Sequence, residues 1–319
     1  MLKYIVETFL DLVFGKPLPV LSELEQKYLL ELNNTFQNTP LLDTKNASPS
    51  ESVWLANSNR LRELVLTGDP RRFLRWDVVT RTMFISYARY IDLEIKYLKR
   101  LNDWSSRWRP AIRESSTGYP TRCIFYPASS ANLIHHAYHL ARHEERTGVR
   151  AEDLDLVFEF GGGYGSMCRL FYNLGFKGKY VLLDLPGFSA LQRYYLKTLG
   201  LPVLAMPEFA ESRHGILCTS DTMVVRDMIR NTYDFKKSMF IATWSISECP
   251  IALRDMIMPF VAGFNSFLIA YRDEFGEVDN SEYFSHWKGM LDNVNWHLLP
   301  IAHIPDNTYL FGKHVSKNK

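Results

Sequence analysis

Two spacings of hydrophobic residues follow one another along the 319-residue chain, and the change lies near residue 150. Before that point, apolar residues recur at helical spacing over three segments, 1–15, 76–101 and 130–146. Ser129 or Ser130 is the expected N-cap of the third segment, and Gly148 follows it, as is typical of the two ends of a helix. Residues 39–52 are rich in polar residues and contain two prolines, which predicts a loop. We therefore predict a helical amino-terminal region over residues 1–150.

After residue 150, short apolar runs rich in β-branched and aromatic residues alternate with helical segments at 166–174 and 189–199. The predicted strands are 154–160, 179–185, 201–206, 238–244, 265–271, 295–304 and 308–313. Residues 215–221 fit the third strand as well as 201–206 do. Strands that alternate with helices predict an α/β fold, with a mostly parallel sheet covered by helices on both faces. Only a short turn separates the last two runs, which predicts an antiparallel hairpin at the edge of the sheet.

The overall composition adds few constraints on function. A net charge of +2 gives no electrostatic reason to expect a nucleic acid or an acidic membrane as partner, and a small molecule suits the chain better. The four cysteines form no CxxC pair, which favours a reducing, cytoplasmic location over a disulfide scaffold. Glu7 and Asp11 interrupt the apolar stretch that a secretory signal needs, and no uncharged stretch is long enough to span a membrane.

A glycine-rich loop is the main chemical signal of the chain. Glu159, Gly161, Gly163 and Gly165 form an E-x-G-x-G-x-G motif directly after a predicted strand and before a predicted helix. Glycine accepts positive φ in a tight turn, and its lack of a side chain lets a ligand lie against the backbone. Asp184 ends the next strand about 20 residues further on, where a carboxylate can accept hydrogen bonds from both hydroxyls of a ribose. The order of strand, glycines, helix and acid predicts a site for a nucleoside cofactor.

The two obvious cofactors are a nicotinamide dinucleotide and S-adenosylmethionine (SAM). In the dinucleotide motif G-x-G-x-x-G, Gly161 and Gly163 would require glycine or alanine at position 166, where the chain has Ser166. Glu159 would lie near the anionic pyrophosphate of a dinucleotide, whereas SAM offers this glutamate an ammonium group. No Gly-Lys-Ser/Thr follows, which excludes a P-loop. The motif therefore favours SAM.

Three segments carry a resemblance to a known family, namely 159–167 (EFGGGYGSM), 181–196 (VLLDLPGFSALQRYYL) and 242–248 (ATWSISE). Together they resemble the sugar O-methyltransferases among class I SAM-dependent methyltransferases, loosely from Tyr119 to Gly312. The resemblance implies a Rossmann-like fold with a seven-stranded sheet. It also implies that SAM lies over the first two strands and the acceptor over the fourth and fifth.

The same resemblance implies which residues contact the cofactor. It implies that Asp184 binds the ribose hydroxyls and that the methionine part and the ribose lie against the glycine loop. The expected cofactor-binding residues are Glu159, Gly161, Gly162, Gly163, Tyr164, Gly165, Asp184 and Leu185. The family pattern usually has methionine after its Ser-x-x-Glu motif, whereas Cys249 and Pro250 follow here, so the acceptor side differs.

Methyl transfer to a hydroxyl needs a general base that removes the proton. Glu248 is the first candidate because it lies just past the fourth strand, where Trp244, Ser245 and Ser247 are expected to contact the acceptor. The alternative for Glu248 is a capping box with Ser245, which has the required S-x-x-E spacing. Asp273, after the fifth strand, is a further candidate, although a solvated loop acid is the simpler interpretation.

Histidines on the helix predicted over 130–146 are the other candidate bases. His135, His139 and His143 share one helix face, and His136 lies beside it. No carboxylate or cysteine with ligand spacing joins them locally, so we expect no metal and interpret this face as polar and partly exposed. His135 or His136 then serves as a base in the acceptor pocket.

We therefore predict an enzyme, a SAM-dependent methyltransferase that acts on a hydroxyl of a sugar or a glycosylated small molecule. A methyltransferase for a non-sugar hydroxyl or an amine is the alternative, and a SAM-binding partner protein without turnover is a third hypothesis. Residues 151–319 form the SAM-binding domain in this interpretation, and residues 1–150 form an acceptor lid or the surface of a homo-oligomer.

Overall fold

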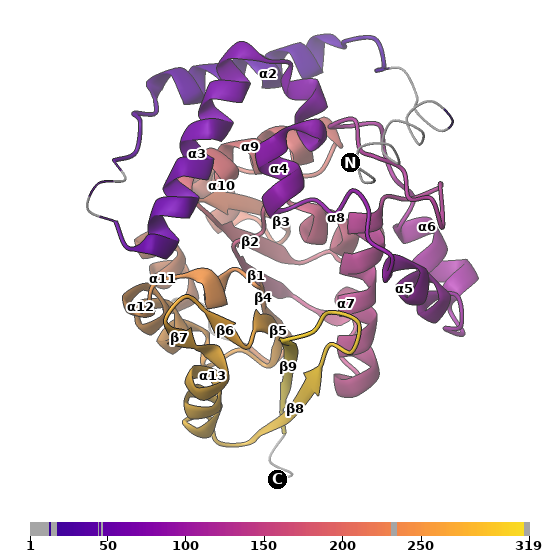
Figure 1. The fold of residues 1–319 in the computed structure, drawn as a ribbon, viewed down its shortest axis with the longest axis vertical. Helices are drawn as coiled ribbons and strands as arrows, with labels where there is room; N and C mark the ends of the chain where they lie inside the picture. The colour runs from indigo at the N-terminus through magenta and orange to yellow at the C-terminus, as the bar shows by residue number, and fades with distance from the viewer. Residues whose placement is uncertain (1–12, 14–17, 44, 46, 231–234, 316–319) are drawn as a thin grey trace.

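A computed structural model describes residues 13, 18–43, 45, 47–230 and 235–315 (Figure 1). One sheet of seven strands has the order β3-β2-β1-β4-β5-β9-β8. The strands are β1 Leu156–Phe160, β2 Lys179–Leu183, β3 Gly215–Thr219, β4 Ser238–Thr243, β5 Ser266–Arg272, β8 Val294–Pro300 and β9 Asn307–His314. The first five are parallel to one another, and β9 runs antiparallel to both β5 and β8. The predicted mostly parallel sheet and its terminal hairpin are confirmed.

Helices cover both faces of this sheet because successive strand residues point to opposite faces. On β1, Val157 belongs to the core shared with α7, α8 and α9, whereas Phe158 belongs to the core on the other face. The helices of the first face are α7 Ala131–Thr147, α8 Ser166–Asn173 and α9 Pro186–Thr198. Those of the second face are α11 Thr222–Arg230, α12 Ile251–Val261 and α13 Asn280–Gly289. The fold is therefore the expected Rossmann-like, doubly covered α/β fold.

The amino-terminal region is helical and packs onto the first face. Its helices are α2 Glu23–Asn38, α3 Pro49–Thr67, η1 Pro70–Arg75, α4 Asp77–Thr82, α5 Ile91–Leu98, η2 Trp104–Trp108 and α6 Arg109–Ala111. In Figure 1, α2 and α3 lie across α9, and α5 lies beside α7. Phe73, Val78 and Ile95 of this region share one hydrophobic core with residues of the sheet. The predicted helix over residues 1–15 lies outside the described residues apart from Val13.

The remaining elements are short. They are η3 Ala151–Asp153, α10 Met206–Glu211, η4 Ile246–Glu248, β6 Glu274–Phe275 and β7 Val278–Asp279, and the last two form a two-stranded ribbon. None of the helices in the described part of the chain has the length and hydropathy needed to cross a membrane.

Three predicted elements differ from the structure. Residues 201–206 form no strand, and the third strand is β3, because residues after Pro202 make only an isolated bridge from Val203 to Ile216. Residues 49–52 of the predicted loop are the first turn of α3, which Ser48 caps in a capping box with Glu51. The predicted helix over 76–101 is two helices, α4 and α5, with residues 83–90 between them.

The helix predicted over 130–146 is confirmed as α7. Ser130 caps it by accepting a hydrogen bond from the backbone N–H of Leu133, and Gly148 ends it at φ 67°. One residue of α7 also explains the break after α4. The side chain of Asn132 accepts the backbone N–H of Ile85, so residue 85 is held by α7 rather than by a continuing helix.

Candidate cofactor and acceptor site

The glycine loop between β1 and α8 contains residues with positive φ and packs closely against side chains of other segments. Gly161 and Gly163 have φ values of 69° and 59°. A Cβ atom on Gly161 would lie 2.3 Å from the Cβ of Ser245, and one on Gly162 would lie 2.3 Å from a methyl carbon of Leu182. Neither position has room for a side chain, so both require glycine.

A cavity of about 690 Å³ opens over this loop, at the carboxyl ends of β1, β2 and β4. The expected cofactor residues that line it are Glu159, Gly161, Gly162, Gly163, Tyr164, Asp184 and Leu185. The other side of the cavity comes from the amino-terminal region and α7, through Glu51, Trp54, residues 80–88, Tyr90, Asn132, His135 and His136. Gly165 was also expected at the cofactor, but it is not among the lining residues and packs against Leu196 instead.

Glu159 lines the cavity and is almost fully buried. The hydroxyl of Tyr180 donates a hydrogen bond to its Oε2 at 2.7 Å. Burial raises the pKa of Glu159 to about 8, although Tyr180 opposes this shift. Glu159 is therefore protonated at neutral pH, and a cation in the cavity would stabilise its charged form.

Asp184 lies where the sequence predicts it, but much of its hydrogen-bonding capacity is used within the protein. Its Oδ2 accepts the backbone N–H of Gly163 at 3.0 Å and the side-chain amide of Gln192 at 2.9 Å. Its Oδ1 accepts the backbone N–H of Leu185 at 2.8 Å. Since a carboxylate has about four acceptor positions, one remains for a ligand where the sequence predicted two contacts. Burial raises the pKa of Asp184 to about 7, despite these three bonds.

The turn after β4, where the sequence predicts the acceptor, also lines the cavity. Trp244 has φ 63°, which is unusual for a residue other than glycine, and its indole N–H donates to Asn307 at 2.5 Å. Ser245 lines the cavity and donates its hydroxyl to the carbonyl of Phe160. Ser247 is fully buried, donates to the carbonyl of Trp244 and does not line the cavity, so its predicted acceptor contact is wrong.

Glu248 lines the cavity, and Ser245 makes no side-chain capping bond to η4. The alternative interpretation of these two residues as a capping box is therefore excluded. Burial raises the pKa of Glu248 to about 7, and Arg272 and Trp54 oppose the shift. Glu248 can thus exchange a proton near neutral pH.

Asp273 is not among the cavity-lining residues. Its carboxylate accepts the hydroxyl of Thr308 at 2.7 Å, and its backbone carbonyl accepts the N–H of Asn280. Asp273 joins the end of β5 to neighbouring segments, and its predicted role as a base is wrong.

The histidine face of α7 is buried, because α7 packs against β5 and β9, and its predicted partial exposure is wrong. Each of the three rings on this face has one close partner. The pairs are His135 with Glu94 at 2.7 Å, His139 with Tyr309 at 2.5 Å, and His143 with Ser266 at 2.8 Å. Of these three, His135 lines the cavity. Within the described residues, no group of three or more histidine, cysteine, aspartate or glutamate side chains could hold a metal ion.

His136 also lines the cavity, but no hydrogen bond to a described residue orients its ring. Its Nδ1 is buried without a hydrogen-bond partner among the described residues. Burial and the neighbouring His135 lower the pKa of His136 to about 3, which makes it a weak base.

The sequence analysis missed Glu94, Trp54 and the segment 83–88. Glu94 lies in an ordinary amphipathic helical pattern, and no local motif distinguishes it from Asp92 or Lys96. Trp54 and residues 83–88 precede the glycine loop by many residues, so only packing brings them to the cavity. A polar residue on the apolar face of α5 was the one available signal for Glu94.

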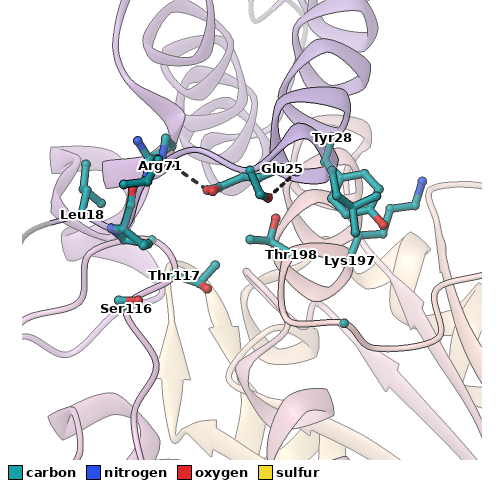
Figure 2. Close-up of a pocket in the computed structure, with 14 residues that line it drawn as sticks. Leu18, Glu25, Tyr28, Arg71, Ser116, Thr117, Lys197 and Thr198 are labelled. Carbon is teal, nitrogen blue, oxygen red and sulfur yellow. Dashed lines mark hydrogen bonds and ion pairs between the residues drawn. The ribbon is translucent and has the colours of Figure 1, made fainter.

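A second, smaller hollow of about 260 Å³ lies between α2, the residues before it and the end of α9 (Figure 2). Arg71 forms an ion pair with Glu25 at 3.3 Å, and Lys197 pairs with Glu31 at 2.8 Å. The glycine loop does not contribute to this hollow. Arg71 thus pairs with a residue of the same hollow, and Lys197 with Glu31 outside it.

No protein-family model and no curated protein matches this chain. Among solved structures, it is similar to the glycopeptide N-methyltransferase MtfA complexed with sinefungin, with 15% identity, coverage of 56% of this chain and 85% of the other, and a TM-score of 0.37. It is also similar to the precorrin-6y C5,15-methyltransferase from Geobacter metallireducens, with 12% identity, 56% and 88% coverage, and a TM-score of 0.36. A third is MtNAS in complex with MTA and tNA, with 12% identity, 91% and 97% coverage, and a TM-score of 0.38. The fold assignment rests on the strand order itself.

Proposed function

We propose that this chain is a SAM-dependent methyltransferase that transfers a methyl group to a hydroxyl of a sugar or a glycosylated small molecule. One observation carries the proposal. The glycine loop, with Glu159 and Asp184, opens into the same cavity as a set of aromatic side chains and two groups able to accept a proton, His135 and Glu248. Cofactor and acceptor would therefore meet at the carboxyl end of β4.

The residues present fit SAM better than a dinucleotide. The backbone of Gly161 to Gly163 lines the cavity, and Asp184 keeps one acceptor position for a ribose hydroxyl. The described lining residues include four carboxylic side chains, Glu51, Glu159, Asp184 and Glu248, and one guanidinium, that of Arg81. Arg81 is paired with Asp77 at 2.5 Å. This balance favours a cationic cofactor, and SAM when bound supplies a methyl group activated by a sulfonium.

The acceptor half is aromatic and carries little positive charge. Trp54, Tyr87, Tyr90 and Trp244 line it and offer apolar faces on which a sugar ring or an aglycone can stack. Phosphates are usually bound by arginine or lysine. A neutral glycoside therefore suits this cavity better than a sugar nucleotide. In this proposal, residues 1–150 form the acceptor lid of a SAM-binding domain over 151–319.

Two measurements test the proposal. Isothermal titration with SAM and with NAD should give binding of SAM, and binding of NAD alone would contradict it. Mass spectrometry of products should then show a gain of one methyl group on a hydroxyl of a neutral glycoside, in a panel that also contains sugar phosphates, amines and non-sugar alcohols. Methylation of amines only would favour the alternative acceptor class. SAM binding without any product would favour a partner protein without turnover.

A further inference from the structure

Glu94 is a fully buried carboxylate outside the cavity lining. It lies on α5, between α7 and the segment that follows β8, with 0% of its surface exposed. Its Oε1 contacts Nδ1 of His135 at 2.7 Å and Nε2 of His303 at 2.8 Å. Burial acts to raise the pKa of Glu94, but the two imidazoles outweigh it and hold this pKa below its ordinary value. Glu94 is therefore a charged carboxylate at neutral pH.

This contact determines where the proton of His135 lies. A carboxylate only accepts hydrogen bonds, so the ring nitrogen that faces it must carry the proton. The proton of neutral His135 is then on Nδ1, and Nε2 keeps its lone pair. No hydrogen bond joins Nε2 to any residue that the structure describes, and His135 lines the cavity. Its ring lies nearly parallel to the indole of Trp244, at 18° and 5.7 Å between centroids.

We propose that Glu94 and His135 form a dyad in which Nε2 of His135 takes the proton of the acceptor hydroxyl and Glu94 acts as a positioning residue. The inference rests on the proposed function. In the transfer, the acceptor oxygen forms a bond to the methyl carbon while the methyl–sulfur bond breaks, and the bonding pair leaves on sulfur. The hydroxyl proton passes to Nε2, which gives a methyl ether and an imidazolium. Water later removes this proton.

The other groups around His135 are uncharged, so Glu94 is the group that can balance the positive charge of the imidazolium. Tyr90, the residue before α5, faces the ring, and burial raises its pKa above the ordinary value, so it is uncharged at neutral pH. The ring centroids of His139 and His135 lie 3.9 Å apart, and burial lowers the pKa of His139. His136 is also neutral, and Trp244 does not titrate. His303 reaches the dyad through the same oxygen of Glu94.

The dyad separates His135 from the two other candidate bases. His136 has no partner among the described residues that fixes its ring, and its low pKa makes it a weak base. Glu248 interacts with Trp54 of the proposed acceptor lid and with Arg272 at the end of β5. Neither of these two partners is a carboxylate. A base oriented by a carboxylate on its far side has the geometry that general-base catalysis uses in other enzymes.

An acceptor-free measurement tests the dyad first. In the full chain labelled with ¹⁵N-histidine, long-range proton–nitrogen spectra report which ring nitrogen carries the proton, and His135→Gln identifies the signals of His135. We expect a protonated Nδ1 and an unprotonated Nε2 at neutral pH. A proton on Nε2 would overturn the proposal, whatever acceptor the protein uses.

Kinetics with the neutral glycoside found in the panel then tests catalysis. We expect His135→Gln to lower kcat by about 10²- to 10⁴-fold, and Glu94→Gln, which keeps the shape but removes the charge, by at least about tenfold. KM and the affinity for SAM should stay near their wild-type values. His303→Gln is the matched control, because His303 contacts the same oxygen of Glu94 but does not line the cavity. Equal losses in Glu94→Gln and His303→Gln would assign Glu94 a structural role only and overturn the proposal. If no glycoside is methylated, the proposed function fails. The spectra still show whether Glu94 holds the proton of His135 on Nδ1.

Discussion

The carboxylate of Asp184 accepts a hydrogen bond from the backbone N–H of Gly163 at 3.0 Å. This bond joins the end of β2 to the glycine loop that follows β1. Two motifs that appear separate in the sequence are therefore one structural unit. Asp184 holds the shape of the loop and also faces the cavity, so its removal should affect the cofactor in two ways.

Asp184→Ala should weaken SAM binding by about 1–3 kcal/mol, because it removes a ligand contact and leaves the N–H of Gly163 without its partner. Isothermal titration measures this loss. Asp273→Ala is the matched control, since Asp273 also follows a strand of the same sheet but does not line the cavity. An unchanged affinity in Asp184→Ala would contradict its assigned role.

Glu159 should make SAM binding depend on pH. Burial raises its pKa to about 8, so it is protonated at neutral pH, and a bound cation favours the carboxylate form. SAM binding at neutral pH should therefore release protons, and the affinity should increase as pH rises through about 8. Titration in two buffers of different ionisation enthalpy measures the proton release. Glu159→Gln should reduce both effects, and an unchanged proton release in this variant would assign the effect to another group.

Gly161→Ala should destabilise the protein more than Gly276→Ala does. Both glycines have positive φ, at 69° and 62°, so both substitutions cost about 1–2 kcal/mol of backbone strain. Only at Gly161 would the new Cβ meet another residue, Ser245 at 2.3 Å, which adds about 1–3 kcal/mol of overpacking. Urea unfolding of the two variants measures the difference. A second substitution, Ser245→Gly, should recover part of the loss, and equal free energies of unfolding in the two single variants would reject the contact.

His143 should make the protein less stable in acid. Burial lowers its pKa to about 3, below the value of about 6.5 expected in the unfolded chain. The unfolded state therefore binds the proton more strongly, and the stability from neutral His143 is lost as pH falls from about 6.5 towards 3. His143→Gln should lower the free energy of unfolding at neutral pH and make it less dependent on pH in this range.

Urea unfolding at several pH values tests this prediction. His286→Gln is the control, because His286 is exposed on α13 and should leave the pH dependence as it is in the wild type. The prediction fails if His143→Gln and the wild type lose stability in parallel as the pH falls.

The sequence determined the local part of the fold and the glycine loop at one side of the cavity. Side chains alternate across a strand and repeat every three to four residues on a helix, so burial leaves a pattern in the sequence itself. This pattern was sufficient for four of the five parallel strands, for α7 and for the terminal hairpin, but it left the third strand undecided between 201–206 and 215–221. The glycine loop and Asp184 were predictable for a related reason, since positive φ and close backbone contact require glycine within a short segment.

The residues of the proposed acceptor half of the cavity come together only in the tertiary structure. Glu94 precedes His135 by 41 residues, and the two meet because α5 packs on α7. Other tertiary contacts keep Ser247 and Asp273 out of the cavity, and Asn132 of α7 binds residue 85 just after α4. Contacts of this kind depend on how whole helices lie on the sheet, and no short stretch of sequence records that arrangement. The glycine loop can therefore be recognised within one segment of the sequence. The proposed base can be recognised only once distant helices are packed together.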